Sequence, residues 1–312
     1  MKKFLGSAIT FLICALIIYY RKPIATYLYK NFIFKQEVNI PEVTSYKKEN
    51  DYEYVKNTND FSPKNKEEVL NVLYTIINSG WTEFSFYCDD SYKTCNEDIN
   101  DIAKDNTILG NINNFVHPYN TYSSITLSIN NFNRVTVSIE HLYTSSDILK
   151  IDKQVDTIYN DLIKPNMSDY DKIKKIHDYI INNTKYDQEK EKDPLDSNKY
   201  LYKSNMAYGP LINGIALCGG YTDAMALFLE KMGIDNYRIS SENHIWNLVY
   251  INEKWKHLDL TWDDPVVTKD DKNATINENV LTHKFFLIDT IVLKNLDKDQ
   301  HNYNTNVYLE AN

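Results

Sequence analysis

The sequence predicts an α+β protein with two successive folded units. Apolar residues recur at helical spacing in several segments, most clearly after Cys218, and alternating polar and apolar residues predict strands over 123–130, 134–143 and 244–259. Together with an apolar run at the N-terminus, these patterns divide the chain into four parts. We expect a membrane anchor over 1–22, a stalk over 23–60, a small α+β module over 61–165 and a larger domain over 166–312.

The N-terminal segment has the composition of a membrane anchor. Two lysines precede an uncharged apolar run over 4–20, at the short end of the roughly 17–25 residues that span a bilayer. No small-x-small cleavage site follows the run, which favours an uncleaved anchor over a cleaved signal peptide. Tyr19 and Tyr20 suit the membrane interface. We therefore expect a single-pass membrane protein with its N-terminus inside and its folded units outside.

Overall charge excludes one class of partner. The 312 residues carry a formal net charge of −9, and nucleic-acid binding would need a basic face. The polar segment "KKENDYEYVKNTND" has no sustained period, as expected of a stalk. Another acidic stretch, "DDPVVTKDDKNATINEN", lacks the glycine and the carboxylate spacing of a calcium loop, so we expect a solvated loop there. We expect no metal and no cofactor.

The predicted module over 61–165 has one helix and one hairpin as its clearest elements. The segment "SPKNKEEVLNVLYTIINSG" predicts a helix that Ser62 caps and Gly80 ends. Cys88 and Cys95 lie seven positions apart in a polar turn, and outside the membrane a disulfide between them is expected. Two unrelated thiols are the alternative. His117 and His141 have no partner in the pattern, and we interpret them as structural.

The second unit begins near Ser168, which can cap a helix with apolar residues at helical spacing. His177 lies inside this helix, and we interpret it as structural. A further helix follows Cys218, with Tyr221, Ala224 and Phe228 on one buried face and Gly233 at its end.

Cys218 therefore stands at a helix N-terminus. The unpaired N–H groups and the positive end of the helix dipole favour a thiolate there. Gly219 and Gly220 remove side chains beside the sulfur, so we expect a substrate to approach there and the local N–H groups to serve an oxyanion. A packed core cysteine is the alternative, although such a residue does not require flanking glycines.

A base and its orienting carboxylate are expected from the hairpin over 244–261. If Tyr250 faces Trp255, paired residue numbers sum to 505, and His244 and Asp259 become diagonal neighbours on one face. Such a pair can orient an imidazole as a base for the thiol. His257 shares that face and is the rival base. Trp246 lies beside His244 and can shield it from water.

At this point the pattern resembles the transglutaminase-like superfamily. The resemblance covers about residues 168–290 and rests on "ALCGGYTDAM", "HIWN" and "LDLTWDD", with "DYDKIKKIHDYIINNTKYD" and "AYGPLING" upstream. It implies a papain-like core in which a nucleophile helix packs on an antiparallel sheet. It also implies Cys218 as nucleophile, His244 as base and Asp259 as orienting group. Tyr208 and Tyr221 are candidates for the oxyanion-stabilising group, with packing the alternative for each. His283 and His301 have no expected partner, and we interpret them as structural.

The resemblance implies thiol acyl chemistry and leaves the acceptor open. An acyl transferase would form a thioester with a glutamine-type amide and pass the acyl group to an amine. A hydrolase would use water, with proteolysis, deamidation or cleavage of cell-wall peptide as the outcome. A non-catalytic binding module is the third alternative, although it would not need all three groups. We expect a protein or peptide partner, such as cell-wall peptide, at the cell surface.

Overall fold

A computed structural model describes residues 14–28, 38–130, 133–192, 203–264 and 281–312. The helices are α2 (Arg21–Leu28), α3 (Lys66–Asn78), α4 (Cys95–Lys104), α5 (Asn106–Asn114), α6 (Ser145–Leu162), α7 (Asp169–Asn182), α8 (Gln188–Lys192), α9 (Cys218–Met232), α10 (Leu260–Asp263) and α11 (Thr290–Leu296), with a 3-10 turn η2 (Pro118–Asn120) and a π-helical turn η4 (Gly209–Asn213). The strands are β1 (Glu83–Tyr87), β2 (Tyr122–Ile129), β3 (Arg134–His141), β4 (Lys185–Tyr186), β5 (Ile215–Ala216), β6 (Asn236–Ser240), β7 (Ile245–Ile251) and β8 (Lys254–Leu258).

The N-terminal segment of the described chain is helical over 14–19 and again in α2. Within the described residues, none of the helices has both the length and the apolar character that a membrane crossing requires. Most of the predicted anchor, residues 4–13, lies outside the described part of the chain. The anchor therefore stays a prediction.

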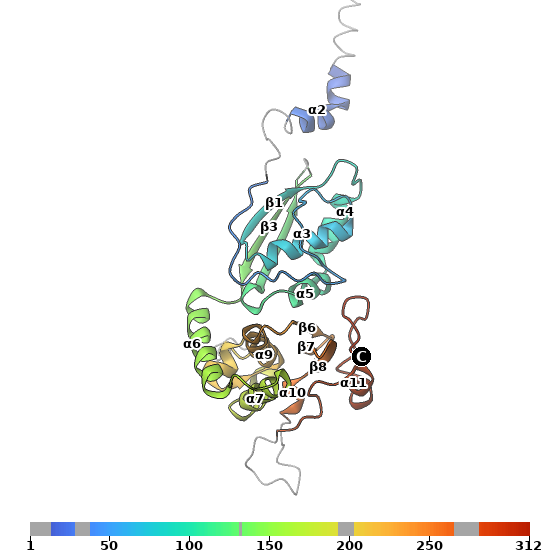
Figure 1. Cartoon of the computed structure of the whole chain (residues 1–312). Helices are drawn as coiled ribbons and strands as arrows, with labels where there is room; N and C mark the ends of the chain where they lie inside the picture. Colours follow the sequence, from blue (N-terminus) through green and yellow to red (C-terminus); the bar gives the residue numbers. More distant parts are fainter. Residues whose placement is uncertain (1–13, 29–37, 131–132, 193–202, 265–280) are drawn as a thin grey trace, which may run out of the picture.

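The first folded unit is an antiparallel sheet covered by helices (Figure 1). Its strands lie in the order β1-β3-β2, with the predicted hairpin forming β2 and β3. Helix α3 buries Val69, Leu73 and Ile76 on one face, because these residues recur at helical spacing. Its N-cap is Asn65, whose side chain accepts from the Glu68 N–H, so the expected cap at Ser62 is wrong by one turn.

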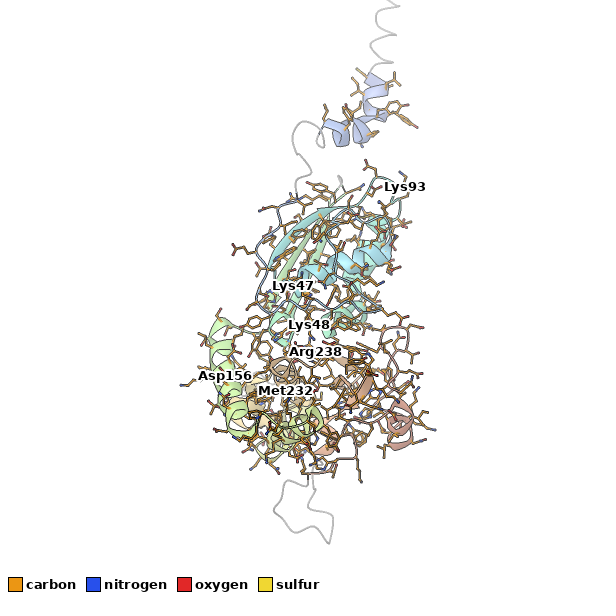
Figure 2. All side chains as sticks on the ribbon, in the orientation of Figure 1. Lys47, Lys48, Lys93, Asp156, Met232 and Arg238 are labelled. Atoms are coloured by element: carbon orange, nitrogen blue, oxygen red, sulfur yellow. A yellow bond between two sulfur atoms is a disulfide. The ribbon has the colours of Figure 1, made fainter. Side chains whose placement is uncertain are left out.

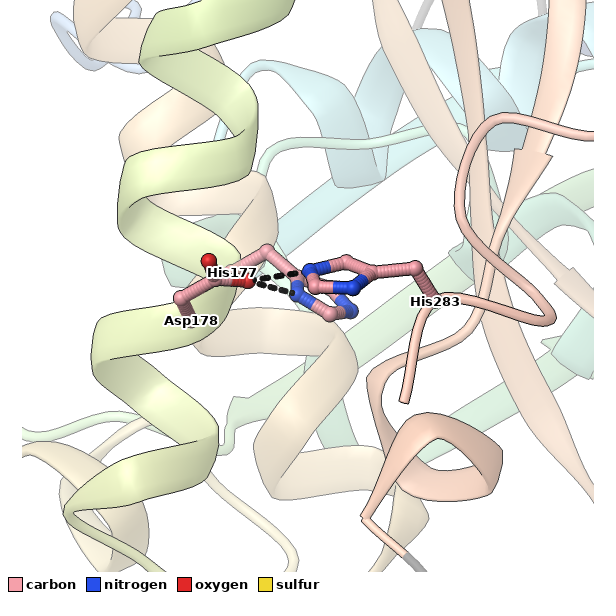
Figure 3. Close-up of side chains that lie close together, drawn as sticks. All are labelled: His177, Asp178 and His283. Carbon is pink, nitrogen blue, oxygen red and sulfur yellow. Dashed lines mark hydrogen bonds and ion pairs between the residues drawn. The ribbon is translucent and has the colours of Figure 1, made fainter. Parts of the chain in front are cut away.

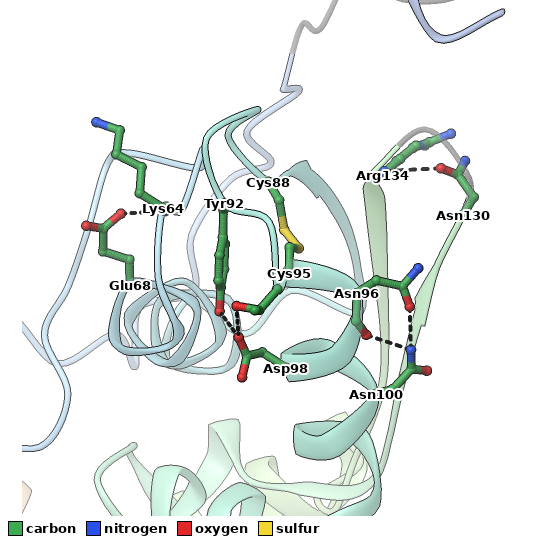
Figure 4. The surroundings of a disulfide bond; sticks show 11 residues. Lys64, Glu68, Cys88, Tyr92, Cys95, Asn96, Asp98, Asn100, Asn130 and Arg134 are labelled. Carbon is green, nitrogen blue, oxygen red and sulfur yellow. Dashed lines mark hydrogen bonds between the residues drawn. A yellow bond between two sulfur atoms is a disulfide. The ribbon is translucent and has the colours of Figure 1, made fainter. Parts of the chain in front are cut away.

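A disulfide joins Cys88, just after β1, to Cys95, the first residue of α4 (Figure 4). Both cysteines are buried. The same turn is held by Tyr92 and Thr94, whose hydroxyls both donate to Asp98 at 2.8 Å. The bond therefore fastens the start of α4 to the end of β1.

Residues 38–60 do not form the free stalk that their polar composition predicted. Val55 is fully buried, and the backbone of Lys48 is bonded in both directions to the side chain of Asn78 on α3. Nearer the start of this segment, the Thr44 hydroxyl donates to the side-chain oxygen of Asn120. The segment lacks a hydrophobic period because it is held largely by hydrogen bonds to the first unit rather than by an apolar face.

The second unit has a sheet in the order β6-β7-β8, all antiparallel, with α9 packed on β6 and β7. Helix α7 lies against α9, and α6 packs against α7, α9 and η4. The expected division at residue 165 assigned α6 to the first module, whereas α6 packs with the second unit. The change of unit therefore comes before Ser145.

Buried charges connect the two units (Figure 2). Lys48 pairs with Glu230 on α9 at 2.7 Å and donates to the carbonyl of Asn236. Arg238 on β6 pairs with Asp223 at 2.8 Å and donates to the carbonyl of Val116. Because Lys48, Asp223 and Arg238 are buried and each is paired, they give the interface a defined geometry.

Candidate active site

Cys218 is the first residue of α9 and is partly exposed. The chain reaches it through β5, which pairs in parallel with β4, and through Leu217, whose N–H donates to Ser204 at 2.8 Å. Leu217 is the N-cap and offers no side-chain oxygen to the helix. The sulfur therefore lies at the positive end of an uncapped helix of 15 residues, where a negative charge is stabilised.

The two glycines after Cys218 serve a purpose other than the expected one. A Cβ on Gly219 would lie 2.9 Å from the carbonyl oxygen of Asn205, and one on Gly220 would lie 2.2 Å from that of Ser204. The Gly220 N–H donates to the Leu217 carbonyl. The glycines admit the protein's own backbone rather than a substrate, and the N–H of Gly220 is not free for an oxyanion.

The hairpin has the predicted register. Tyr250 pairs with Trp255 and Leu248 with His257, so paired numbers sum to 505. The turn residues Asn252 and Glu253 have φ of 52° and 63°, the left-handed pair that a two-residue hairpin turn requires. His244 lies directly before β7 and Asp259 directly after β8, at the same end of the hairpin.

His244 and Asp259 are in direct contact. The His244 Nε2 donates to Oδ2 of Asp259 at 2.5 Å, and both side chains are buried. Because Nε2 is engaged, Nδ1 is the ring nitrogen left for its hydrogen bond with Cys218. Burial alone would lower the pKa of His244, but the Asp259 charge and these bonds raise that pKa to about 10. The imidazole therefore favours its protonated form beside the sulfur.

Every lone-pair direction of the Asp259 carboxylate is used by a donor. Oδ1 accepts from the N–H groups of Thr261 and Trp262, because Asp259 is the N-cap of α10. Oδ2 accepts from His244 and also from Nε2 of His301, at 2.9 Å. Burial would raise the pKa of Asp259, but the charge and hydrogen bond of His244, followed by those of His301, hold it well below its usual range. This carboxylate is therefore ionised.

His301 is a site residue that the sequence did not indicate. Its Nδ1 donates to Asp297 at 2.7 Å while its Nε2 reaches Asp259, so both ring nitrogens bind carboxylates. It comes from the C-terminal segment, 42 positions from Asp259. The i,i+4 spacing of Asp297 and His301 is a local signal, but nothing in that spacing points to Asp259.

Aromatic rings surround the imidazole of His244. Trp246 stacks on it with a centroid distance of 5.5 Å and an interplanar angle of 17°, and Trp262 lies at 6.5 Å. Phe285 stacks in turn on His301 at 5.3 Å. The expected neighbour Trp246 is therefore present and fully buried, within a wider aromatic wall.

His257 is not placed to act as the base. Its Nδ1 accepts from Nε1 of Trp246 at 3.1 Å, and its Nε2 lies 2.9 Å from the hydroxyl of Thr290. Burial lowers the pKa of His257 to about 3, so the ring is neutral. Its role is to hold Trp246 behind His244.

The two predicted oxyanion candidates have other partners. Tyr221 is fully buried and donates to Oδ2 of Asp264 at 2.5 Å. The hydroxyl of Tyr208 accepts from Lys150, and Lys203 lies over its ring at 4.8 Å. Tyr186 was missed. It lies on β4, opposite Ala216, and burial followed by the charge of Cys218 raises its pKa.

The remaining histidines fall into separate environments. His117 is buried, and its Nδ1 accepts from the N–H of Tyr119; His141 bonds to the carbonyls of Thr121 and Gly80. In the part of the chain that the structure describes, two groups bring three potential metal ligands within 4.8 Å of one another. One is His244, Asp259 and His301, already described, and the other is His177, Asp178 and His283.

Comparison with known proteins finds a family match within the second unit. Residues 156–260 match the model of the transglutaminase-like superfamily. No curated protein matches the chain significantly. One solved structure, "Crystal structure of a TGase", is 17% identical with a TM-score of 0.33, covering 53% of this chain and 49% of that one.

Another, "The Crystal Structure of a Putative Cysteine Protease from Cytophaga hutchinsonii", is 14% identical with a TM-score of 0.27, covering 44% of this chain and 61% of that one. The present chain therefore spans about half the length of the first structure and less than two thirds of the second.

Proposed function

Because residues 156–260 carry a transglutaminase-like core, we propose that this protein is a thiol acyltransferase in which Cys218 is the nucleophile, His244 the acid and base, and Asp259 the orienting group. The contact that carries the proposal is the 2.5 Å bond between His244 Nε2 and Asp259, which leaves the other ring nitrogen, Nδ1, for Cys218. A non-catalytic module would not need a buried imidazole held between a carboxylate and a partly exposed thiol.

The first step forms a thioester. The Cys218 thiolate attacks the carbonyl carbon of a glutamine-type carboxamide, and the C–N bond breaks as the His244 imidazolium gives its Nδ1 proton to the leaving ammonia. Asp259 stabilises the imidazolium in the ground state and holds its tautomer after the proton has left. The N–H groups of Cys218 and Gly219, at the start of α9, are the donors we propose for the oxyanion, joined by the Tyr186 hydroxyl when it turns away from Glu191.

The second step transfers the acyl group. An amine attacks the thioester carbonyl, His244 accepts the proton that the amine loses, and the thiolate leaves. Transfer competes with hydrolysis, which uses water in place of the amine and gives a free acid. The aromatic wall of Trp246, Trp262 and Phe285 supports transfer because it limits the water around His244.

An assay of both products tests this proposal. The full-length protein is given a glutamine-containing peptide with and without a primary amine, and ammonia release and amine incorporation are measured. Transfer predicts incorporation that rises with amine concentration. Ammonia release without amine incorporation would indicate the hydrolase. If neither product forms and Cys218 is alkylated no faster than a model thiol, the non-catalytic binding module is the remaining interpretation.

Two variants assign the roles. Asp259→Asn keeps the shape but removes the charge that orients the imidazole, and we expect kcat to fall by about 10⁴. His257→Gln, the matched control, should retain most of the activity because His257 bonds Trp246 and Thr290 instead of the thiol. If activity is lost in His257→Gln and kept when His244 is replaced, His257 is the base and the assignment is reversed.

We also propose that the enzyme acts outside the cell, on protein or cell-wall peptide, held by a membrane segment over residues 4–20. The support is the disulfide between Cys88 and Cys95, since such bonds persist in oxidising compartments. Alkylation of intact cells with a membrane-impermeant thiol reagent tests the placement. Labelling of Cys218 is expected, and protection until the cells are lysed would contradict it.

A further inference from the structure

A second cluster of histidines lies outside the proposed triad (Figure 3). His177 and Asp178 are neighbours on α7, and His283 comes from the chain beyond α10. The Oδ1 of Asp178 lies 2.9 Å from Nδ1 of His177 and 2.7 Å from Nε2 of His283. Two imidazoles and a carboxylate therefore converge on one point from two parts of the chain.

A proton alone cannot satisfy His283. Its Nε2 lies 2.7 Å from the Asp178 carboxylate, which only accepts, and 2.9 Å from Nζ of Lys174, which only donates. One nitrogen cannot present a hydrogen to the first and a lone pair to the second. A metal ion in place of the hydrogen, with the Lys174 ammonium moved away from Nε2, resolves the conflict, because the imidazole lone pair and the carboxylate would both face the ion.

The buried member of the cluster is oriented as a metal ligand would be. His177 is fully buried, and its other nitrogen, Nε2, lies 3.2 Å from Oδ2 of Asp263. A carboxylate behind a ligating histidine sets the tautomer and raises the basicity of the nitrogen that faces the metal. Asp178 is supported in the same way, since its second oxygen accepts from Lys174.

We propose that His177, Asp178 and His283 bind one Zn²⁺ ion. Two imidazole nitrogens and one carboxylate oxygen are a typical zinc donor set, with water in the fourth position. The exposed edge at His283, whose side chain is 34% exposed, leaves room for that water. Ligand atoms of a tetrahedral zinc site lie about 3.3 Å apart, so Asp178 Oδ1 and the two histidine nitrogens, now 2.9 and 2.7 Å from it, must separate by roughly half an ångström.

The place of the site in the fold would let the bound metal fix the position of a distant chain segment. The orienting residue, Asp263, ends α10, whose N-cap is Asp259. The Oδ1 of Asp263 also accepts from the hydroxyl of Thr282 and the N–H of Phe285. A metal at His283 would therefore tie α7 to the start of the segment 281–312, which carries His301 to the triad. Phe285, next along this segment, stacks on His301.

Zinc titration of the full-length protein tests the site. After chelation and gel filtration, Zn²⁺ is added in competition with a chromophoric chelator, and Co²⁺ replaces it for absorption spectra. We expect one equivalent of Zn²⁺ that raises Tm, and a Co²⁺ spectrum of tetrahedral intensity. A protein that takes up no stoichiometric Zn²⁺ would overturn the proposal and leave a hydrogen-bonded cluster around Asp178.

Variants locate the ion. His283→Ala changes a partly exposed residue and should lower the Zn²⁺ affinity at least about tenfold and abolish the rise in Tm. Asp169→Asn, on the same helix but paired with Lys172 rather than with the cluster, is the matched control and should bind normally. Equal binding by wild type and His283→Ala would place the ion elsewhere and contradict the proposal.

Discussion

His301 donates a hydrogen bond to Oδ2 of Asp259 at 2.9 Å, the same oxygen that accepts from His244 at 2.5 Å. The two rings cross nearly perpendicularly, with centroids 5.2 Å apart. The Oδ2 of Asp259 therefore has a second donor, which is independent of the hairpin and comes from the C-terminal segment. His301 acts through Asp259 and is a positioning residue.

Removal of this donor should reduce activity without preventing substrate binding. In His301→Ala, Asp259 loses one charged hydrogen bond, which contributes about 1.5–3 kcal/mol, so we expect kcat to fall by roughly tenfold or more. The KM should change little. The pH profile of kcat should also shift, whereas Glu310→Gln, which only breaks an exposed pair with Lys294, should match wild type. An unchanged pH profile would assign His301 to packing alone.

The raised pKa of His244 should make stability depend on alkaline pH. A histidine with a folded pKa of about 10 contributes stability that is complete below about 6.5 and is lost as the pH rises toward 10. We expect the free energy of unfolding to fall over this range. In Asp259→Asn the slope should flatten, and urea unfolding at several pH values measures it. An equal slope in both proteins would count against the ion pair.

The disulfide should stabilise the first unit without affecting chemistry. Loss of a bridge that closes a loop of seven residues costs roughly 2 kcal/mol by the chain-entropy relation. Cys88→Ser combined with Cys95→Ser should therefore lower Tm, while amine incorporation at 25 °C stays unchanged. A loss of activity at a temperature where the variant is folded would show that the first unit takes part in catalysis.

The close approach at Gly220 predicts a specific sensitivity. An alanine Cβ there would meet the carbonyl oxygen of Ser204 at 2.2 Å. Gly220→Ala should therefore destabilise the protein by about 1–3 kcal/mol and slow the alkylation of Cys218 by iodoacetamide. Gly110→Ala on α5 is the matched control, since among the described residues nothing beyond its own helix turn and chain neighbours lies within 4 Å of an added Cβ. That change should stabilise the protein by about 1 kcal/mol. Chemical denaturation and iodoacetamide rates distinguish the two.

Much of the candidate site was predictable because it depends on local rules. The hairpin register follows from the alternation of side chains and from a short turn, so pairing Tyr250 with Trp255 brings His244 toward Asp259. The helix after Cys218 follows from apolar spacing. The predicted cap of α3 was wrong because Ser62 and Asn65 are both suitable N-cap residues, and it is Asn65 that bonds the Glu68 N–H.

The sequence by itself determined the α+β class, the helix that begins at Cys218 and the hairpin that pairs His244 with Asp259, since each depends on residues close in the chain. Only the tertiary structure decided the remaining contacts. It brought His301 to Asp259, set the backbone of Ser204 against Gly220, and packed residues 38–60 on the first unit. It also joined His283 to α7. These contacts link segments far apart in sequence, and no periodicity or spacing specifies which distant segments will pack together.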